Sequence, residues 1–229
     1  MRLMMLNDLS SLSDTILAER LDAEWSFDRG TGRYRDKRGR FLSRKAVQAI
    51  VDKRIEKLAT KLRRYTQMLS DGNLTLDQWQ ASVREAIKAA HIQNAIIGKG
   101  GRDNMTASDY GKVGQRLRQE YAYLQGFASD LLEQRVSLPM ALARIGLYAE
   151  SSRGSYWQGT ELRQQEQGYS LMRRILDPQA QHCDDCIRYA RAGVVAIGSL
   201  PLPGQRCECR ARCRCSVEYM RQQAPSVPA

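Results

Sequence analysis

The sequence predicts a mainly α-helical protein: an extended helical bundle or scaffold, followed by a small cysteine-rich C-terminal module that contains β-structure and is stabilised by zinc. Two observations predict this architecture. Apolar residues recur every three or four positions in several segments between residues 44 and 168, which is the pattern of amphipathic helices. All six cysteines lie within residues 183–215, where this helical pattern has ended.

The composition is that of a basic, folded protein. Its 229 residues are enough for one or two domains, and 42% of them are hydrophobic, as in globular chains. The 36 Lys+Arg against 25 Asp+Glu give a net charge of +11, which favours polyanionic partners such as nucleic acid. No apolar run reaches the roughly 18 residues of a membrane span, and polar residues 7 and 8 interrupt the apolar start. We therefore expect no signal peptide, no membrane contact and a location in the cytoplasm.

The N-terminal region divides into two segments. In residues 1–24, helical spacing of leucine and isoleucine predicts an amphipathic helix, which could dock on its own chain or on a neighbour; we favour its own chain. Residues 25–43 are basic, with glycines and aromatic residues interspersed, and predict an extended arm or hairpin.

The basic side chains of residues 25–43 are candidates for contacting DNA or an acidic protein surface, because arginine offers paired donors to phosphates and carboxylates. The alternative is an ordinary solvated loop. The candidate residues are Arg29, Arg33, Arg35, Lys37, Arg38 and Arg40.

Residues 44–168 predict a domain of long helices, delimited by capping and helix-stopping residues. Ser43 begins the first helix and residues 71–72 end it; Thr75 begins the second, which ends near residues 98–101. Thr106 or Ser108 begins the third, and Ser137 begins the fourth. The Ser-Ser-Arg-Gly sequence at residues 151–154 predicts a kink or an end within the fourth helix.

The cysteine-rich module is assigned to residues 169–221, with a strand near residues 169–176 and an unstructured tail at 222–229. Cys183 and Cys186 have CxxC spacing, which we interpret as two thiols on one tight turn, and a second cysteine cluster follows about 20 residues later. Such spacing is typical of a structural zinc site. The segment between the clusters is too small to form a core alone, so metal binding would supply its stability.

Six thiols exceed the four that one zinc ion requires, so alternatives stay open. The favoured ligands are Cys183, Cys186, Cys209 and Cys213. Cys207 and Cys215 are left as alternates, spares or disulfide partners, and a set of disulfides made by all six is the competing interpretation. The neighbouring arginines would neutralise the thiolates or, alternatively, bind phosphate; they are Arg206, Arg210, Arg212 and Arg214.

Motifs of zinc deaminases and of phosphate-binding loops are missing from the sequence. The CxxC pair lacks the βαβ setting of a redox centre, and His91 lies within a helical pattern, where its expected role is packing or a place on the surface. The sequence therefore predicts no catalytic residue and no enzyme.

Three features resemble the C-terminal module of phage head-morphogenesis proteins, the minor head proteins related to the F protein of Mu-like phages. They are the Cys183-x-x-Cys186 pair, the Leu-Pro-Leu-Pro-Gly turn at residues 200–204, and the ending Cys213-Arg-Cys215-Ser-x-Glu-Tyr. Residues 34–41 and 105–114 resemble segments of phage-encoded relatives less specifically. Family members commonly end in His-Pro-x-Cys-Arg-Cys, whereas Arg210-Ala-Arg precedes Cys213 here and Cys209 could replace the histidine.

This resemblance implies a minor structural protein of a tailed-phage virion, acting in head assembly or in DNA packaging or ejection. It implies association with the portal or the major capsid protein, in multiple copies within a symmetric assembly, with phage DNA as a further partner of the basic arm. Its location would be the virion, and the host cytoplasm during assembly.

The alternative function is a zinc-containing DNA-binding regulatory protein. Its weakness lies in the segment between the cysteine clusters, where Pro201, Pro203 and Gly204 argue against a recognition helix.

Overall fold

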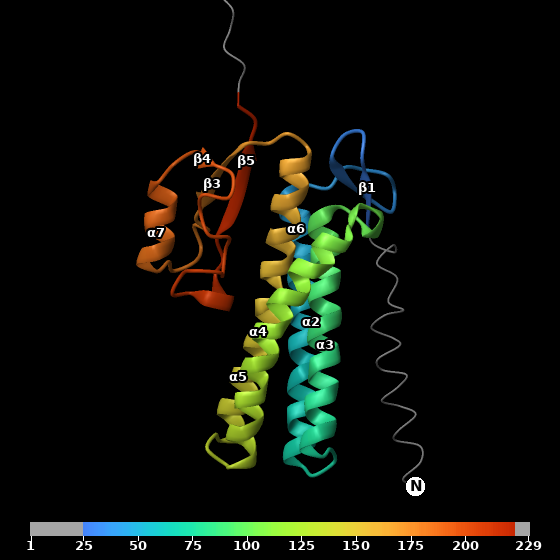
Figure 1. Cartoon of the computed structure of the whole chain (residues 1–229), viewed down its shortest axis with the longest axis vertical. Helices are drawn as coiled ribbons and strands as arrows, with labels where there is room; N and C mark the ends of the chain where they lie inside the picture. The colour runs from blue at the N-terminus through green and yellow to red at the C-terminus, as the bar shows by residue number, and fades with distance from the viewer. Residues whose placement is uncertain (1–24, 223–229) are drawn as a thin grey trace, which may run out of the picture.

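The computed structural model describes residues 25–222 and is mainly helical (Figure 1). The helix predicted for residues 1–24 and all but the first residue of the predicted tail lie outside the described residues. A hairpin sits at one end of a long helical bundle, and the cysteine-rich module lies beside the same half of the bundle (Figure 1).

The basic segment forms a hairpin rather than an extended arm. Strands β1 (Trp25–Asp28) and β2 (Arg33–Asp36) pair antiparallel, with Phe27 opposite Tyr34. Trp25 and Tyr34 are buried, and the Tyr34 hydroxyl donates to the main-chain carbonyl of Ile97 in the bundle. The hairpin is thus fixed to the bundle through its aromatic residues.

The first two bundle helices begin where the sequence predicts. Helix α2 (Arg44–Ser70) starts after Ser43, whose Oγ accepts from the Ala46 amide at 3.1 Å. Helix α3 (Leu76–Lys99) starts with a capping box between Thr75 and Gln78, which satisfies two amides that a helix start leaves unpaired. Gly100 ends α3 with a φ of +88°, a conformation that glycine adopts readily.

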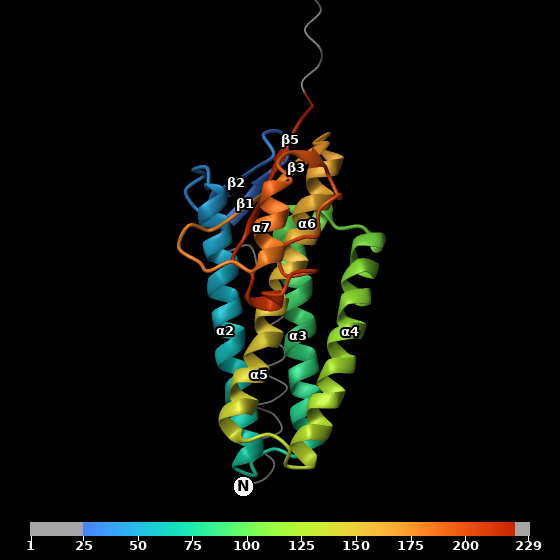
Figure 2. The same ribbon diagram turned by 90° about the vertical axis from the view of Figure 1, so that its left-hand side faces the viewer.

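The remaining bundle helices are α4 (Ala107–Leu132), α5 (Leu138–Ser151) and α6 (Arg153–Glu166), with a short 3₁₀ turn, η2 (Arg102–Asn104), before α4. Thr106 caps α4 through a second capping box. The predicted break in the fourth helix is confirmed, because Ser152 separates α5 from α6. In Figure 2, α4 lies at the opposite side of the bundle from α2, and it packs against α3.

Two glycines allow α3 and α6 to pack with their backbones close together. A Cβ at Gly98 would lie 2.1 Å from the Tyr156 carbonyl oxygen, and one at Gly159 would lie 2.5 Å from the Ala95 carbonyl oxygen. Both separations are far inside van der Waals contact. The two helices can therefore adopt this spacing only with glycine at both positions.

The C-terminal module is built on a three-stranded antiparallel sheet of order β4-β3-β5. The strands are β3 (Leu171–Ile175), β4 (Val195–Ala196) and β5 (Ser216–Met220), with Arg174 opposite Val217. Helix α7 (Asp184–Arg191) and a 3₁₀ turn, η3 (Arg210–Arg212), complete it.

One face of this sheet contributes to the main apolar core. Met172, Leu202, Val217 and Tyr219 belong to the same buried cluster as the bundle residues. η3 contacts α5, and Arg214 pairs with Glu150 of α5 at 3.7 Å. The module is thereby held against the side of the bundle.

Within residues 25–222, none of the helices combines the length and apolar character required to cross a membrane.

Candidate metal centre

Helix α7 places the first two cysteines. Cys183 is its N-cap residue, and Cys186 lies in its first turn, fully buried. The tight turn expected for this CxxC pair is therefore the start of a helix. Helix α7 extends from this pair into the first part of the segment between the two cysteine clusters, ahead of the turn at Pro201, Pro203 and Gly204.

The second cysteine cluster lies on a loop folded by local hydrogen bonds. The Arg210 amide donates to the Cys207 carbonyl at 2.8 Å, and the Cys213 amide donates to the Arg210 carbonyl at 3.1 Å. Arg210 has a φ of +45°, which is uncommon for a residue other than glycine. These turns direct four cysteines of one short loop back towards α7.

Two hydrogen bonds join this loop to α7. The Tyr189 hydroxyl donates to the Arg206 carbonyl at 2.5 Å. The Glu208 amide donates to an Asp185 carboxylate oxygen at 3.2 Å. The two cysteine clusters, separated in sequence, are thereby held side by side.

The structure brings all six cysteines into two overlapping groups. The sulfurs of Cys183, Cys186, Cys207 and Cys209 all lie within 4.8 Å of one another, and so do those of Cys186, Cys213 and Cys215. Tetrahedral zinc with Zn–S bonds of about 2.3 Å separates its sulfurs by about 3.8 Å. All six cysteines are free thiols. The cluster is therefore one that could bind a metal ion.

The predicted ligand set is divided between these two groups. Cys183, Cys186 and Cys209 lie together, but the fourth sulfur of their group belongs to Cys207. Cys213 lies with Cys186, 3.7 Å from its sulfur, in the second group. Cys207 and Cys215, for which the sequence allows the roles of alternates, spares or disulfide partners, are thus part of the cluster, and the choice of ligands stays a prediction.

The thiols differ in their tendency to ionise. Burial opposes ionisation of Cys183, but its interactions with the Cys186 amide and with Cys209 outweigh burial and lower its pKa to about 7. Burial raises the pKa of Cys186, and the neighbouring Cys213 adds to the effect. Interaction with Cys213, together with burial, raises the pKa of Cys207. A bound cation would lower the pKa of these thiols, because metals bind the thiolate form.

The arginine beside the sulfurs comes from outside the cysteine motifs. Arg174 of β3 is only 3% exposed, and its Nη1 lies 4.0 Å from the Cys213 sulfur. Its other terminal nitrogen donates to the Pro201 carbonyl. Sequence reasoning missed Arg174 because it lies nine residues before the first cysteine.

His182 is a further residue that the sequence analysis did not assign. Its Nδ1 lies 3.6 Å from the Cys215 sulfur, and its Nε2 lies 2.7 Å from the Asp177 main-chain carbonyl. Its position directly before the CxxC pair was the available signal, because histidine is a common zinc ligand.

The predicted basic contact residues are dispersed over the hairpin. Arg35 pairs with Asp28 at 2.6 Å and Arg40 with Asp36 at 2.7 Å, and the Arg33 guanidinium lies 4.2 Å from the centre of the Phe41 ring. These contacts hold the hairpin together. The other three candidates, Arg29, Lys37 and Arg38, are exposed.

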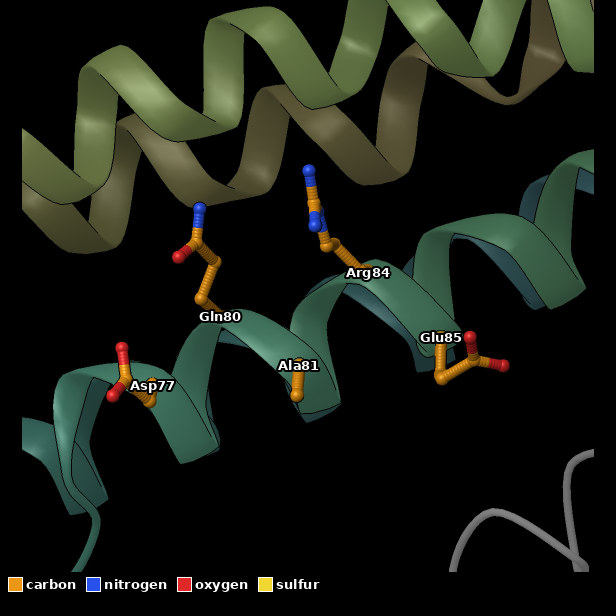
Figure 3. Close-up of a pocket in the computed structure, with 5 residues that line it drawn as sticks. All are labelled: Asp77, Gln80, Ala81, Arg84 and Glu85. Atoms are coloured by element: carbon orange, nitrogen blue, oxygen red, sulfur yellow. The ribbon is translucent and has the colours of Figure 1, made fainter.

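A surface hollow of about 290 Å³ lies along the first turns of α3, lined by Asp77, Gln80, Ala81, Arg84 and Glu85 (Figure 3). All five residues come from one helix. Gln80 and Arg84 point towards neighbouring helices, whereas Glu85 points away from them. This set of mixed charges does not converge on a point, so it suggests no catalytic arrangement.

Comparison with protein-family models, curated proteins and solved structures finds no match for this chain.

Proposed function

We propose that this chain is a minor structural protein of a tailed-phage virion, associated with the portal or capsid shell and acting in head assembly or DNA packaging or ejection. One observation carries the proposal: the motif residues that resemble head-morphogenesis proteins meet in one module packed against the bundle. Cys183, Cys186, Cys213 and Cys215 are in the sulfur cluster. In the proline-rich turn, Leu202 is buried and Pro201 accepts a hydrogen bond from Arg174.

In this proposal the module is stabilised by zinc and has no catalytic role. Zinc suits the site because four thiolates in tetrahedral arrangement are its usual structural ligands. Four thiolates and one Zn²⁺ carry a formal charge of about −2, and the buried guanidinium of Arg174 would offset part of it. The metal would fix the loop that presses η3 against α5.

Arg29, Lys37 and Arg38 are exposed and are the hairpin residues that would contact DNA or an acidic subunit. A symmetric assembly with several copies of the chain would multiply this modest charge. Individual surface contacts of this kind are weak, and repetition gives them combined strength.

The proposal places this gene in a phage genome, and the test uses that phage. Purified particles from wild-type infections should contain the chain, and deletion of the gene should reduce the yield of DNA-filled heads. Complementation with wild-type protein should restore the yield, whereas Cys186→Ser should not. The control variant is Gln181→Ala, at an exposed neighbouring position, which should restore it fully. Particles that lack the chain, together with normal head yield after deletion, would overturn the proposal.

The alternative, a zinc-containing DNA-binding regulator, gains one observation from the structure. α7 lies between the cysteine clusters, as recognition helices do in some zinc modules. However, α7 begins with Asp184 and Asp185 and is only eight residues long, and acidic residues at that end would repel phosphate. Arg188 is already paired with Asp185 at 2.5 Å.

Fluorescence anisotropy with labelled duplexes separates the two functions. The regulator requires one duplex to bind at least about a thousandfold more tightly than unrelated ones. The virion proposal expects similar, salt-sensitive affinity for every duplex, weakened equally by alanine at Arg29, Lys37 and Arg38. Strong selectivity for one sequence would favour the regulator.

A further inference from the structure

The sulfur cluster is larger than one metal ion can use. Cys186 belongs to both groups of sulfurs, and the second group contains Cys213 and Cys215, which are only 1% and 3% exposed. A single ion bound in the first group would leave these two thiols buried beside it without a role. The Cys186–Cys213 separation of 3.7 Å matches the sulfur spacing of a shared tetrahedral centre.

His182 contacts one sulfur of the second group and could supply its fourth donor. Its Nε2 faces the Asp177 carbonyl oxygen at 2.7 Å, and a carbonyl can only accept, so Nε2 carries the proton. The lone pair of the neutral ring is then on Nδ1, which lies 3.6 Å from the Cys215 sulfur. Metal-binding histidines are commonly oriented in this way, with the second nitrogen donating to a carbonyl.

Arg174 provides a separate argument from charge. It is buried, and in the described part of the chain it contacts the Cys213 sulfur, the Pro201 carbonyl and the Tyr189 ring, with no paired carboxylate. Its Nε has no hydrogen-bond partner. A buried cation without a counter-charge is costly. Thiolates bound to metal at Cys213 would supply that negative charge, whereas neutral thiols would not.

We propose that the module binds two divalent metal ions, with zinc as the metal favoured by the donor set. The first ion is held by Cys183, Cys186, Cys207 and Cys209. The second is held by Cys186, whose sulfur bridges both ions, together with Cys213, Cys215 and His182. His182 contacts the second group only through Cys215 and lies outside the set of sulfurs that are within 4.8 Å of one another, so binding would require its ring to move towards Cys186 and Cys213.

The charges are consistent with this arrangement. Six thiolates and two Zn²⁺ leave a formal charge of about −2, the same as an ordinary four-cysteine zinc site. The shared sulfur also gives a reason for the complete burial of Cys186, because it would lie between the two ions. The proposal depends on the first metal site of the proposed function and is independent of the virion role.

The test measures zinc per chain, by elemental analysis of the full-length protein purified in reductant. Wild type should carry two equivalents. His182→Ala and Cys215→Ser should each reduce this to one, and Gln181→Ala, the exposed neighbour of His182, should retain two. Two equivalents in His182→Ala would contradict its role as a ligand. One equivalent in wild type, unchanged by Cys215→Ser, would overturn the second site while leaving the first.

Cadmium-113 NMR of wild type provides a readout that does not depend on the folding of variants. Two signals should appear, one from an ion with four sulfurs and one from an ion with three sulfurs and a nitrogen, each split by coupling through the shared thiolate. A single signal would overturn the proposal. A chain that binds no metal would contradict both this inference and the zinc part of the proposed function, whereas its absence from virions would contradict the virion role alone.

Discussion

At the scale of single residues, the bundle contains buried polar groups, and the neighbours of each group determine the free-energy cost of burying it. Lys99 at the end of α3 is 1% exposed and pairs with Asp109 of α4 at 3.0 Å and with Glu166 of α6 at 2.5 Å. Its side chain thereby links three helices. The two carboxylates differ greatly in environment, since their side chains are 6% and 58% exposed.

This difference predicts unequal effects of neutralising the two partners. Asp109→Asn should lower the free energy of unfolding by about 3 kcal/mol or more, because it leaves buried Lys99 with weaker compensation and alters the cap of α4. Glu166→Gln should lower the free energy of unfolding by less than about 1 kcal/mol, because exposed ion pairs usually contribute no more than that. Urea denaturation of both variants gives the comparison. Equal losses would show that burial does not govern this ion-pair cluster.

His91 lies at the centre of a second buried network. Its Nδ1 is 2.8 Å from the Ser155 Oγ and its Nε2 is 3.4 Å from the Ser151 Oγ, while Glu120 and Arg116 of α4 face the same network. Burial, with a smaller contribution from Arg116, lowers the pKa of His91 to about 3. The histidine is therefore neutral in the folded protein, and its complete burial selects packing over the surface position that the sequence also allowed.

A pH dependence of stability follows. The unfolded chain protonates His91 near pH 6.5, whereas the folded chain does so near pH 3, so stability is full above pH 6.5 and falls as pH decreases. The slope attributable to His91 should approach about 1.4 kcal/mol per pH unit between these limits. His91→Gln, which leaves Glu120 and Arg116 in place, should remove that part of the slope. Parallel wild-type and variant curves from pH 6.5 to 5 would contradict the assignment.

At the scale of elements, the sequence predicts the helices and breaks that are marked by capping residues or by small residues within a short stretch of chain. Ser43, Thr75 and Thr106 identified helix starts because their caps act within a single turn of chain. The small residues near 152 identified the α5–α6 break. The basic segment was left open between arm and hairpin, because its pairing depends on packing of Tyr34 against the bundle.

Helix α7 and strand β5 of the module were not predicted, because both are short. α7 has eight residues, too few for an apolar repeat, although two aspartates at its start and arginines near its end gave a helix-like charge pattern. β5 shows strand alternation at Val217 and Tyr219 over a few residues only. The spacing of the cysteines indicated metal binding, but how they group depends on α7 and the following loop.

The close packing of α3 against α6 predicts how substitution of a glycine between them changes stability. Gly98→Ala should destabilise the protein by about 3 kcal/mol or more, because its Cβ would overlap the Tyr156 carbonyl and overpacking against backbone cannot relax by side-chain rotation. Gly126→Ala on α4 is the matched control. No atom lies within 4 Å of its added Cβ, so it should stabilise the helix by about 0.5–1 kcal/mol. Thermal unfolding measures the stability of both variants. If Gly98→Ala were as stable as wild type, α3 and α6 could move apart without loss of stability.

At the scale of the whole molecule, the bundle and one face of the module's sheet share a large apolar core, whereas the cysteines form a small cluster of their own that could bind metal. The bundle helices share extensive buried surface, whereas the cysteine cluster has few apolar neighbours beyond Leu176 and Tyr189. Removal of metal should therefore affect the module far more than the bundle. It should also release η3 from α5, since the same loop carries four cysteines.

Hydrogen exchange of the reduced, zinc-loaded chain, with and without a chelator, tests this claim most directly. Chelation should accelerate amide exchange in α7 and in the cysteine loop of residues 207–215, while the middle of α2 and α3 stays protected. Returning zinc should restore protection. Unchanged exchange in the module after complete removal of metal would contradict the claim that metal holds it together.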